Sequence, residues 1–124
     1  MGRVLYEPDP AVIRAGQVQA LAERLGAHQI DPTIAYLSAD DAVPTPFARA
    51  YAIESVLPFQ LKRLRQHLVE RGIGRVVVKK RGSAIEPEEL QRRLQLSGNG
   101  PEAVVVLTRQ LGEHVALVGR SLAT

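Results

Sequence analysis

The chain is predicted to have an α+β fold, a two-layer sandwich in which two helices cover one face of a mixed sheet. Apolar residues make up 45% of its 124 residues, a share that is typical of globular domains. From residue 47 onward, strand-like and helix-like periodicities alternate in the order β-α-β-α-β-β. The two strand–helix–strand crossovers predict parallel strand pairs with right-handed connections. A chain of this length buries about two thirds of its unfolded surface and needs no disulfide or metal for stability.

Residues 1–46 are expected to form an extension of the core at residues 47–124, both within one compact domain. A helix begins at Pro10, where Asp9 caps it, and ends at Leu25, before Gly26. The rest of the extension is expected to contain an extended lead-in at Met1–Tyr6, a short strand at Ile34–Leu37 and a loop at Ser38–Pro46.

The core is best defined around residues 59–82. Leu61, Leu64 and Leu68 form the apolar stripe of a helix that Gly72 ends, and the strand Arg75–Arg81 follows it. Side chains alternate along a strand, so Val76, Val78 and Lys80 are expected on one face and Arg75, Val77, Lys79 and Arg81 on the other. The other core elements expected are a strand at Phe47–Leu57, for which a helix is the alternative, a helix from Glu86 to Leu96, and an antiparallel hairpin of Ala103–Arg109 and His114–Ser121.

Positive charge is concentrated in the same segment. The whole chain has a net charge of +3, but residues 59–82 alone carry eight Lys or Arg and one Glu, a net charge of +7. The segments before and after it are slightly acidic, with net charges of −3 and −1. Concentrated basic charge attracts polyanions.

These basic side chains are therefore predicted to contact nucleic acid. Two alternatives remain open: a protein or intramolecular interface, and a solvated helix face with charges that protect a strand end from aggregation. The aromatic residues Phe47, Tyr51 and Phe59 look like core residues, so base stacking is not indicated and contact with backbone phosphates is the form expected. The candidate residues are Lys62, Arg63, Arg65, Arg71, Arg75, Lys79, Lys80 and Arg81.

No catalytic, cofactor or metal site is predicted in this chain. It has no cysteine, which excludes thiolate chemistry and agrees with a cytoplasmic location. Gly72 and Gly74 lie between a helix and a strand, the reverse of the order in dinucleotide-binding loops. The three histidines lie in different elements, and no apolar run is long enough to span a membrane.

Several motifs together resemble one family, the THUMP-like domain found at the C-terminus of bacterial, especially actinobacterial, class I S-adenosylmethionine-dependent methyltransferases. The resemblance covers about residues 5–120. It rests on the segments YEPDPAVIRAG, IDPTIAYLSAD, TPFARAY, VLPF-x-LKRLR, RGIGRVVVKKRG and EPEEL.

The resemblance implies a methyltransferase domain upstream, which would bind S-adenosylmethionine and do the chemistry. The present chain would be a non-catalytic module that binds structured RNA through its basic patch, or a scaffold that packs on the methyltransferase domain without touching nucleic acid. Its Glu7-Pro8-Asp9-Pro10 segment lacks the second consecutive proline and the aromatic residue of the amino-methylating signature. The β-α-β-α-β-β half also resembles RNA-contacting folds such as the C-terminal domain of translation initiation factor three.

Overall fold

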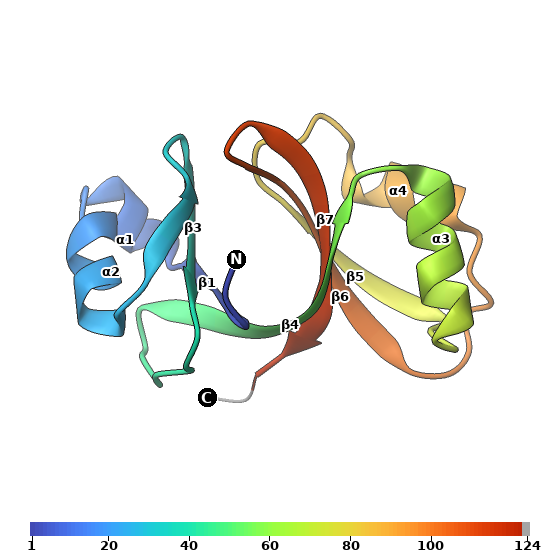
Figure 1. Cartoon of the computed structure of the whole chain (residues 1–124), viewed down its shortest axis with the longest axis horizontal. Coiled ribbons are helices and arrows are strands. Elements are labelled where there is room, and N and C mark those ends of the chain that lie inside the picture. The colour runs from blue at the N-terminus through green and yellow to red at the C-terminus, as the bar shows by residue number, and fades with distance from the viewer. Residues whose placement is uncertain (123–124) are drawn as a thin grey trace.

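The structure, a computed structural model, describes residues 1–122 and confirms the α+β class (Figure 1). One mixed sheet has the strand order β2-β3-β1-β4-β7-β6-β5. Its strands are β1 (Val4–Pro8), β2 (His28–Asp31), β3 (Ile34–Ala39), β4 (Ala48–Pro58), β5 (Arg75–Lys80), β6 (Glu102–Gln110) and β7 (Glu113–Ser121). The helices are α1 (Pro10–Arg14), α2 (Val18–Leu25), α3 (Leu61–Glu70) and α4 (Pro87–Leu94).

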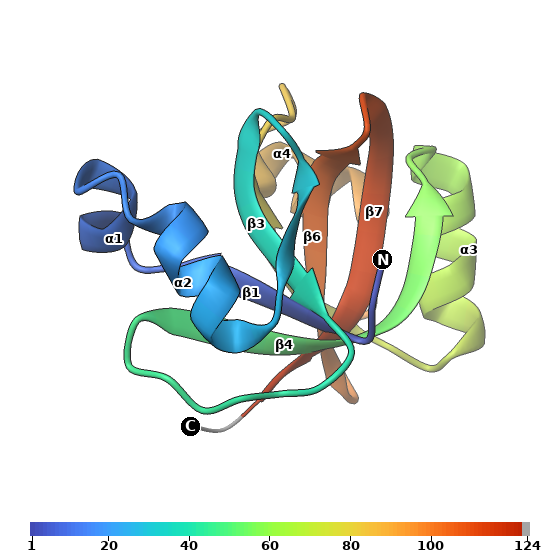
Figure 2. The same cartoon turned by 60° about the vertical axis from the view of Figure 1, so that its left-hand side comes forward.

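The sheet folds back on itself along β4. The first half of this strand pairs with β1 over Ala48–Ala52, and the second half pairs with β7 over Tyr51–Pro58, with an irregularity between Ile53 and Ser55. Figures 1 and 2 show β4 running from one half of the molecule to the other. The inner faces of the two halves share an apolar core formed by Leu5, Ile30, Ile34, Tyr36, Tyr51, Val104, Val106, Val115 and Leu117.

Helices cover the outer face of each half. Leu64 and Leu68 of α3 and Leu90 and Leu94 of α4 pack on β5, β6 and β7, which confirms two helices on one face of the predicted core. On the other half, α2 lies beside β1 and β3 (Figure 2). Its buried Leu21 and Leu25 belong to the same apolar cluster as residues of these strands. Within residues 1–122, no helix is both long and apolar enough to cross a membrane.

The prediction of one continuous helix from Pro10 to Leu25 is wrong. Gly16 adopts a left-handed backbone, with φ of +68°, and divides the segment into α1 and α2. A glycine reaches this conformation without steric penalty, so the chain can turn there. The cap at Asp9 is confirmed, since its carboxylate accepts the N–H of Ala11 at 2.8 Å.

The N-terminal strands are more extensive than predicted. The lead-in contains β1, an interior strand of the sheet between β3 and β4, and the unpredicted β2 pairs with β3. The strand predicted at Ile34–Leu37 continues to Ala39. The division into residues 1–46 and 47–124 stays a prediction.

Only one of the two crossovers makes a neighbouring parallel pair. Strands β5 and β6 pair in parallel as predicted, but β7 and β6 lie between β4 and β5. The hairpin β6–β7 has the most continuously buried strands of the chain, which favours a central position. The partly exposed, basic β5 lies at the edge, where charged side chains discourage further strand pairing.

Local predictions in the core are confirmed. Residues 48–58 form a strand rather than a helix. At the end of α3, Gly72 donates to the carbonyl of Val69 at 3.0 Å and Ile73 donates to that of Leu68 at 3.0 Å, the two bonds of a Schellman stop. The predicted hairpin turns at Leu111 and Gly112, both with positive φ.

Asp31 joins the two halves of the sheet at one end. It is buried, and its Oδ1 accepts hydrogen bonds from the backbone and hydroxyl of Thr33 at 2.9 and 2.7 Å. Its Oδ2 accepts the N–H of Gly112 at 2.9 Å, and Leu111 donates to the carbonyl of Ile30 at 3.2 Å. The turn between β2 and β3 is thereby tied to the turn between β6 and β7.

These hydrogen bonds, chiefly those from Thr33, lower the pKa of Asp31 from 3.8 to about 2. A carboxylate with a depressed pKa in the folded state stabilises the protein above its unfolded pKa, and the contribution is lost as pH falls through the folded value. We expect Asp31→Asn to lower the melting temperature at neutral pH, with the difference from wild type shrinking between about pH 4 and pH 2. Thermal melts across this range test it, with Asp40→Asn, an exposed aspartate, as control; a pH-independent difference would contradict the assignment.

Candidate nucleic-acid interface

Strand β5 divides the basic triplet at its end between two faces. Val76 and Val78 are buried in the core under the helices, and Lys80 lies on their side of the strand, as predicted. Its Nζ forms an ion pair with Oε1 of Glu86 at 2.9 Å. Lys79 and Arg81 instead face the space between the two halves of the sheet. The triplet is therefore two structural features rather than one.

The other predicted cations are distributed over the helix layer and the far end of β5. Lys62 and Arg63 are exposed on α3. The Nε of Arg65 donates to the carbonyl of Leu94 at the end of α4, at 3.0 Å. Arg71 lies 3.9 Å from a carboxylate oxygen of Glu54. At the opposite end of β5 from Lys79, the Nε of Arg75 donates to the carbonyl of Gly100 at 3.3 Å.

Lys62 and Arg63, at the start of α3, nevertheless lie at the same end of the sheet as the end of β5. Strand β4 is antiparallel to β7, β7 is antiparallel to β6, and β6 is parallel to β5. Strands β4 and β5 therefore run in the same direction. Helix α3 begins just after β4 ends. Lys62 and Arg63 are therefore at the end of the sheet where β5 also ends, with Lys79, Lys80 and Arg81. Three strand spacings separate β4 from β5, about 15 Å.

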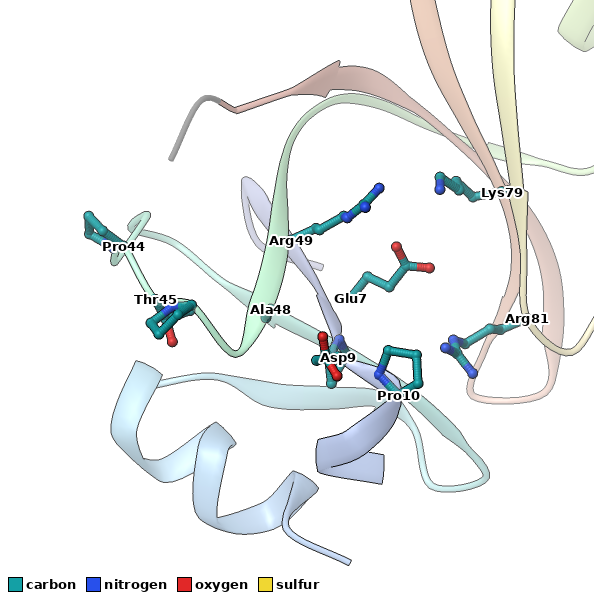
Figure 3. Close-up of a pocket in the computed structure, with 11 residues that line it drawn as sticks. Glu7, Asp9, Pro10, Pro44, Thr45, Ala48, Arg49, Lys79 and Arg81 are labelled. Carbon is teal, nitrogen blue, oxygen red and sulfur yellow. The ribbon is translucent and has the colours of Figure 1, made fainter. Parts of the chain in front are cut away.

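A hollow of about 750 Å³ lies between the two halves of the sheet (Figure 3). Arg49 and Glu7 extend into it from β4 and β1, and Lys79 and Arg81 face them from the opposite wall. No Lys or Arg in the hollow is within 4.0 Å of a carboxylate oxygen in the described part of the chain. We call this space the hollow; its lining is Glu7, Pro8, Asp9, Pro10, Pro44, Thr45, Pro46, Ala48, Arg49, Lys79 and Arg81.

Arg49 and Glu7 are site residues that the sequence did not reveal. They come together because β1 and β4 pair in a register that sets Glu7 opposite Arg49. Arg49 stands alone among alanines and lies outside the basic segment, so its charge gave no signal. The alternation of Ala48, Arg49 and Ala50 placed its side chain on one face of a strand, but not opposite β5.

Two buried tyrosines lie behind the charged wall. The guanidinium carbon of Arg81 is 5.7 Å from the ring centroid of Tyr36, a cation–π distance. Tyr51 donates from its hydroxyl to Oε1 of Glu7 at 3.3 Å. Burial, followed by the negative charge of Glu7, raises the pKa of both tyrosines. Both hydroxyls therefore remain protonated at neutral pH and can donate hydrogen bonds.

The polar groups around the hollow suit an anion better than a metal. Within residues 1–122, no three His, Asp or Glu side chains are grouped so as to hold a metal ion. The guanidinium, ammonium and hydroxyl groups are donors, and guanidinium and ammonium groups bind phosphate oxygens.

Comparison with known proteins identifies the family of the chain. The model of the THUMP domain-like family matches residues 48–121, more than half of the chain. The chain belongs to this family. The match begins at β4 and ends with β7, so it includes Arg49, Lys79 and Arg81 and excludes Glu7. The resemblance found in the motifs is thereby confirmed.

The relatives of this THUMP-like chain are longer proteins. Two uncharacterized S-adenosylmethionine-dependent methyltransferases of Mycobacterium tuberculosis, from strains CDC 1551 and H37Rv, are each 43% identical over 105 residues. The match covers 85% of this chain but 29% of each relative. The crystal structure of a proposed methyltransferase from Porphyromonas gingivalis W83 superposes with a TM-score of 0.81 at 25% identity, covering 99% of this chain and 30% of that one.

Proposed function

We propose that the chain is a non-catalytic, C-terminal module of a cytoplasmic S-adenosylmethionine-dependent methyltransferase, and that it binds structured RNA. The curated relatives are named as methyltransferases and are about three times as long as the matched segment, which leaves room for a separate domain that binds S-adenosylmethionine. The partner of the module is then the methyltransferase domain of the same protein, and its role is to hold the substrate.

The observation that carries RNA binding is that the start of α3 and the end of β5 lie at the same end of the sheet. Lys62 and Arg63 are exposed there, and Lys79 and Arg81 are not neutralised by an ion pair within the described residues. Strands β4 and β5 are about 15 Å apart, and Lys62 and Arg63 lie on the helix side of the sheet while Lys79 and Arg81 face the other side, so a folded RNA would contact these cations through phosphates at several positions. The full contact set proposed is Lys62, Arg63, Arg65, Arg75, Lys79, Lys80 and Arg81.

A salt titration tests this proposal. If six of these seven cations, all but the distant Arg75, each neutralise one phosphate on a duplex, the log–log slope of affinity against salt is near −5. The variant Lys62→Gln/Arg63→Gln removes two exposed cations and should make the slope shallower by about 2, with affinity at 0.15 M salt falling roughly 30-fold. Fluorescence anisotropy with a fully paired RNA hairpin measures both quantities.

The control variant is Arg14→Gln/Arg24→Gln, which removes the same charge from exposed positions on α1 and α2. It should leave the slope unchanged, because these helices lie on the other half of the sheet. An affinity that does not respond to salt, or an equal loss in both variants, would rule out this surface as the RNA contact.

One observation favours the scaffold alternative. The loop between β3 and β4 exposes two large apolar side chains, Val43 at 41% and Phe47 at 46%, so the prediction that Phe47 is a core residue is wrong. It is held in place by Tyr6, whose hydroxyl accepts the N–H of Val43 at 2.7 Å and donates to the carbonyl of Asp41 at 3.1 Å. A fixed apolar loop of this kind suits docking on the methyltransferase domain. Protection of the loop amides from hydrogen exchange in the whole methyltransferase, without RNA affinity, would favour this function.

A further inference from the structure

We propose that the hollow binds one nucleoside monophosphate unit, with its phosphate at Arg49 and Lys79 and a hydroxyl or amino group of its sugar or base at Glu7. The inference rests on the proposed function to the extent that the nucleotide is an unpaired residue of RNA. A free nucleotide offers the same chemistry, and the test separates the two sources.

The first support is the volume and the arrangement of charge. At about 750 Å³ the hollow is within the range of small-molecule sites, and it is larger than a lone phosphate needs. Three cations from β4 and from the end of β5 line it, with Arg49 and Lys79 on one side of Glu7 and Arg81 on the other (Figure 3). They form no ion pair with Glu7 or Asp9 within the described residues, so their charge is available to a ligand.

The second support is the carboxylate of Glu7. Its Oε1 accepts the hydroxyl of Tyr51, which fixes the group, whereas its Oε2 has no hydrogen bond within residues 1–122. A carboxylate among cations repels a second bare anion but accepts hydrogen bonds from hydroxyl and amino groups. A ligand with a phosphate at one end and donors at the other satisfies both signs of charge.

The third support is the set of unpartnered polar atoms behind the wall. The hydroxyl of Tyr36, Nε of Arg81 and Oγ1 of Thr108 are buried and have no hydrogen-bond partner among the described residues. Tyr36 and Thr108 are each 1% exposed, and buried polar groups are ordinarily paired. Arg81 lines the hollow and also contacts the ring of Tyr36, so a ligand at Arg81 lies next to this set.

The remaining wall suits a sugar or a base. Four proline rings, those of Pro8, Pro10, Pro44 and Pro46, line the hollow with flat apolar surface. Asp9 is already used, since it caps α1 through the N–H of Ala11, so Glu7 is the carboxylate left for recognition. The hollow thus combines phosphate-binding, hydrogen-bonding and apolar surfaces, as a nucleotide requires.

The first part of the test uses small probes on the full chain. Adenosine 5′-monophosphate, adenosine and inorganic phosphate are titrated and followed by amide chemical shifts. We expect the monophosphate to bind at least tenfold tighter than either of the other two, with shifts at Glu7, Arg49 and Lys79. The variant Arg49→Gln/Lys79→Gln should weaken this binding at least tenfold, and Glu7→Gln should bring the monophosphate close to inorganic phosphate in affinity.

The second part compares two RNA hairpins, one fully paired and one with a single bulged nucleotide. We expect wild type to prefer the bulged hairpin at least fivefold, and Arg49→Gln/Lys79→Gln to lose this preference while it still binds the paired hairpin. The matched control, Lys62→Gln/Arg63→Gln, should weaken both hairpins and keep the preference.

The outcomes separate the two proposals. If the paired hairpin binds but the bulge gives no preference and the monophosphate does not bind, the nucleotide site is overturned and the proposed function stands. If neither hairpin binds but the monophosphate does, the site is a free-nucleotide site and the RNA proposal fails. Equal binding of inorganic phosphate and the monophosphate overturns the nucleotide assignment.

Discussion

Truncation of Leu68 to alanine is expected to destabilise the domain by about 2–5 kcal/mol. Leu68 is fully buried beneath α3, in the core that this helix shares with α4 and the outer face of β5, β6 and β7. Removing most of its side chain loses transfer free energy and leaves a cavity that the surrounding leucines and valines only partly close. Because natural domains have about 5–15 kcal/mol of stability, this is a large fraction of the total. Urea denaturation followed by circular dichroism measures it.

The neighbouring Val69→Ala is the matched control. Val69 lies on the same helix but is 49% exposed, so its truncation should change the free energy of unfolding by no more than about 0.5 kcal/mol. Both variants keep the helix propensity of α3 nearly constant or improve it, since alanine is the best helix former. Equal losses in the two variants would mean that α3 is not packed through its leucine stripe.

Gly119→Ala is expected to cost roughly 2–3 kcal/mol, although it adds one methyl group. Gly119 is opposite Ile53, where β4 passes from β1 to β7. A Cβ added there would overlap the carbonyl oxygen of Ala52, and the nearest atoms are backbone, which a rotamer change cannot move. The irregular pairing between Ile53 and Ser55 lies at the same place, so the absent side chain of Gly119 is what permits β4 to bend. Denaturation gives the free energy, and the amide shifts of Ala52 and Ile53 report the local change.

The contrasting variant is Gly72→Ala. Gly72 has φ of +71° and nothing within 4 Å of the added carbon, so its cost is conformational only, about 1 kcal/mol. It should leave the amide shifts of β4 unchanged. A Gly119→Ala protein as stable as wild type, with unaltered shifts at Ala52 and Ile53, would show that β4 bends without requiring this glycine.

The sequence predicted elements whose signal is local. The leucine stripe of α3, the stop at Gly72 and the alternation along β5 depend on residues a few positions apart, and all are confirmed. Strand β2 was not predicted because it is four residues long and begins with His28 and Gln29, which are not buried. The sequence also did not predict which strands lie beside β4. Whether β5 or β7 pairs with it depends on the burial of strands that are distant in the sequence, and no local pattern contains that information.

The candidate site was predicted in part for the same reason. The concentrated positive charge predicted Lys79 and Arg81 as site residues, and the alternation of side chains along a strand predicted that they lie on the opposite face from Lys80. It did not show that Lys80 is paired with Glu86 or that Arg65 caps α4, because both partners lie in another element. The hollow exists only through the bend of β4, so it became visible only once the pairing of β1 with β4 was known.

The bend in β4 also has a consequence for the way the chain folds. Each half of the strand pairs with a partner some 40 to 70 residues away, as the pairs Pro8–Ala48 and Tyr51–Ser121 show. Such contacts give the fold a high contact order, and domains of this kind fold in milliseconds to seconds. During synthesis, β4 leaves the ribosome before β7 exists, with one edge open. Glu54 is exposed in the part of β4 that later pairs with β7, and a charge at an open strand edge disfavours pairing with another chain.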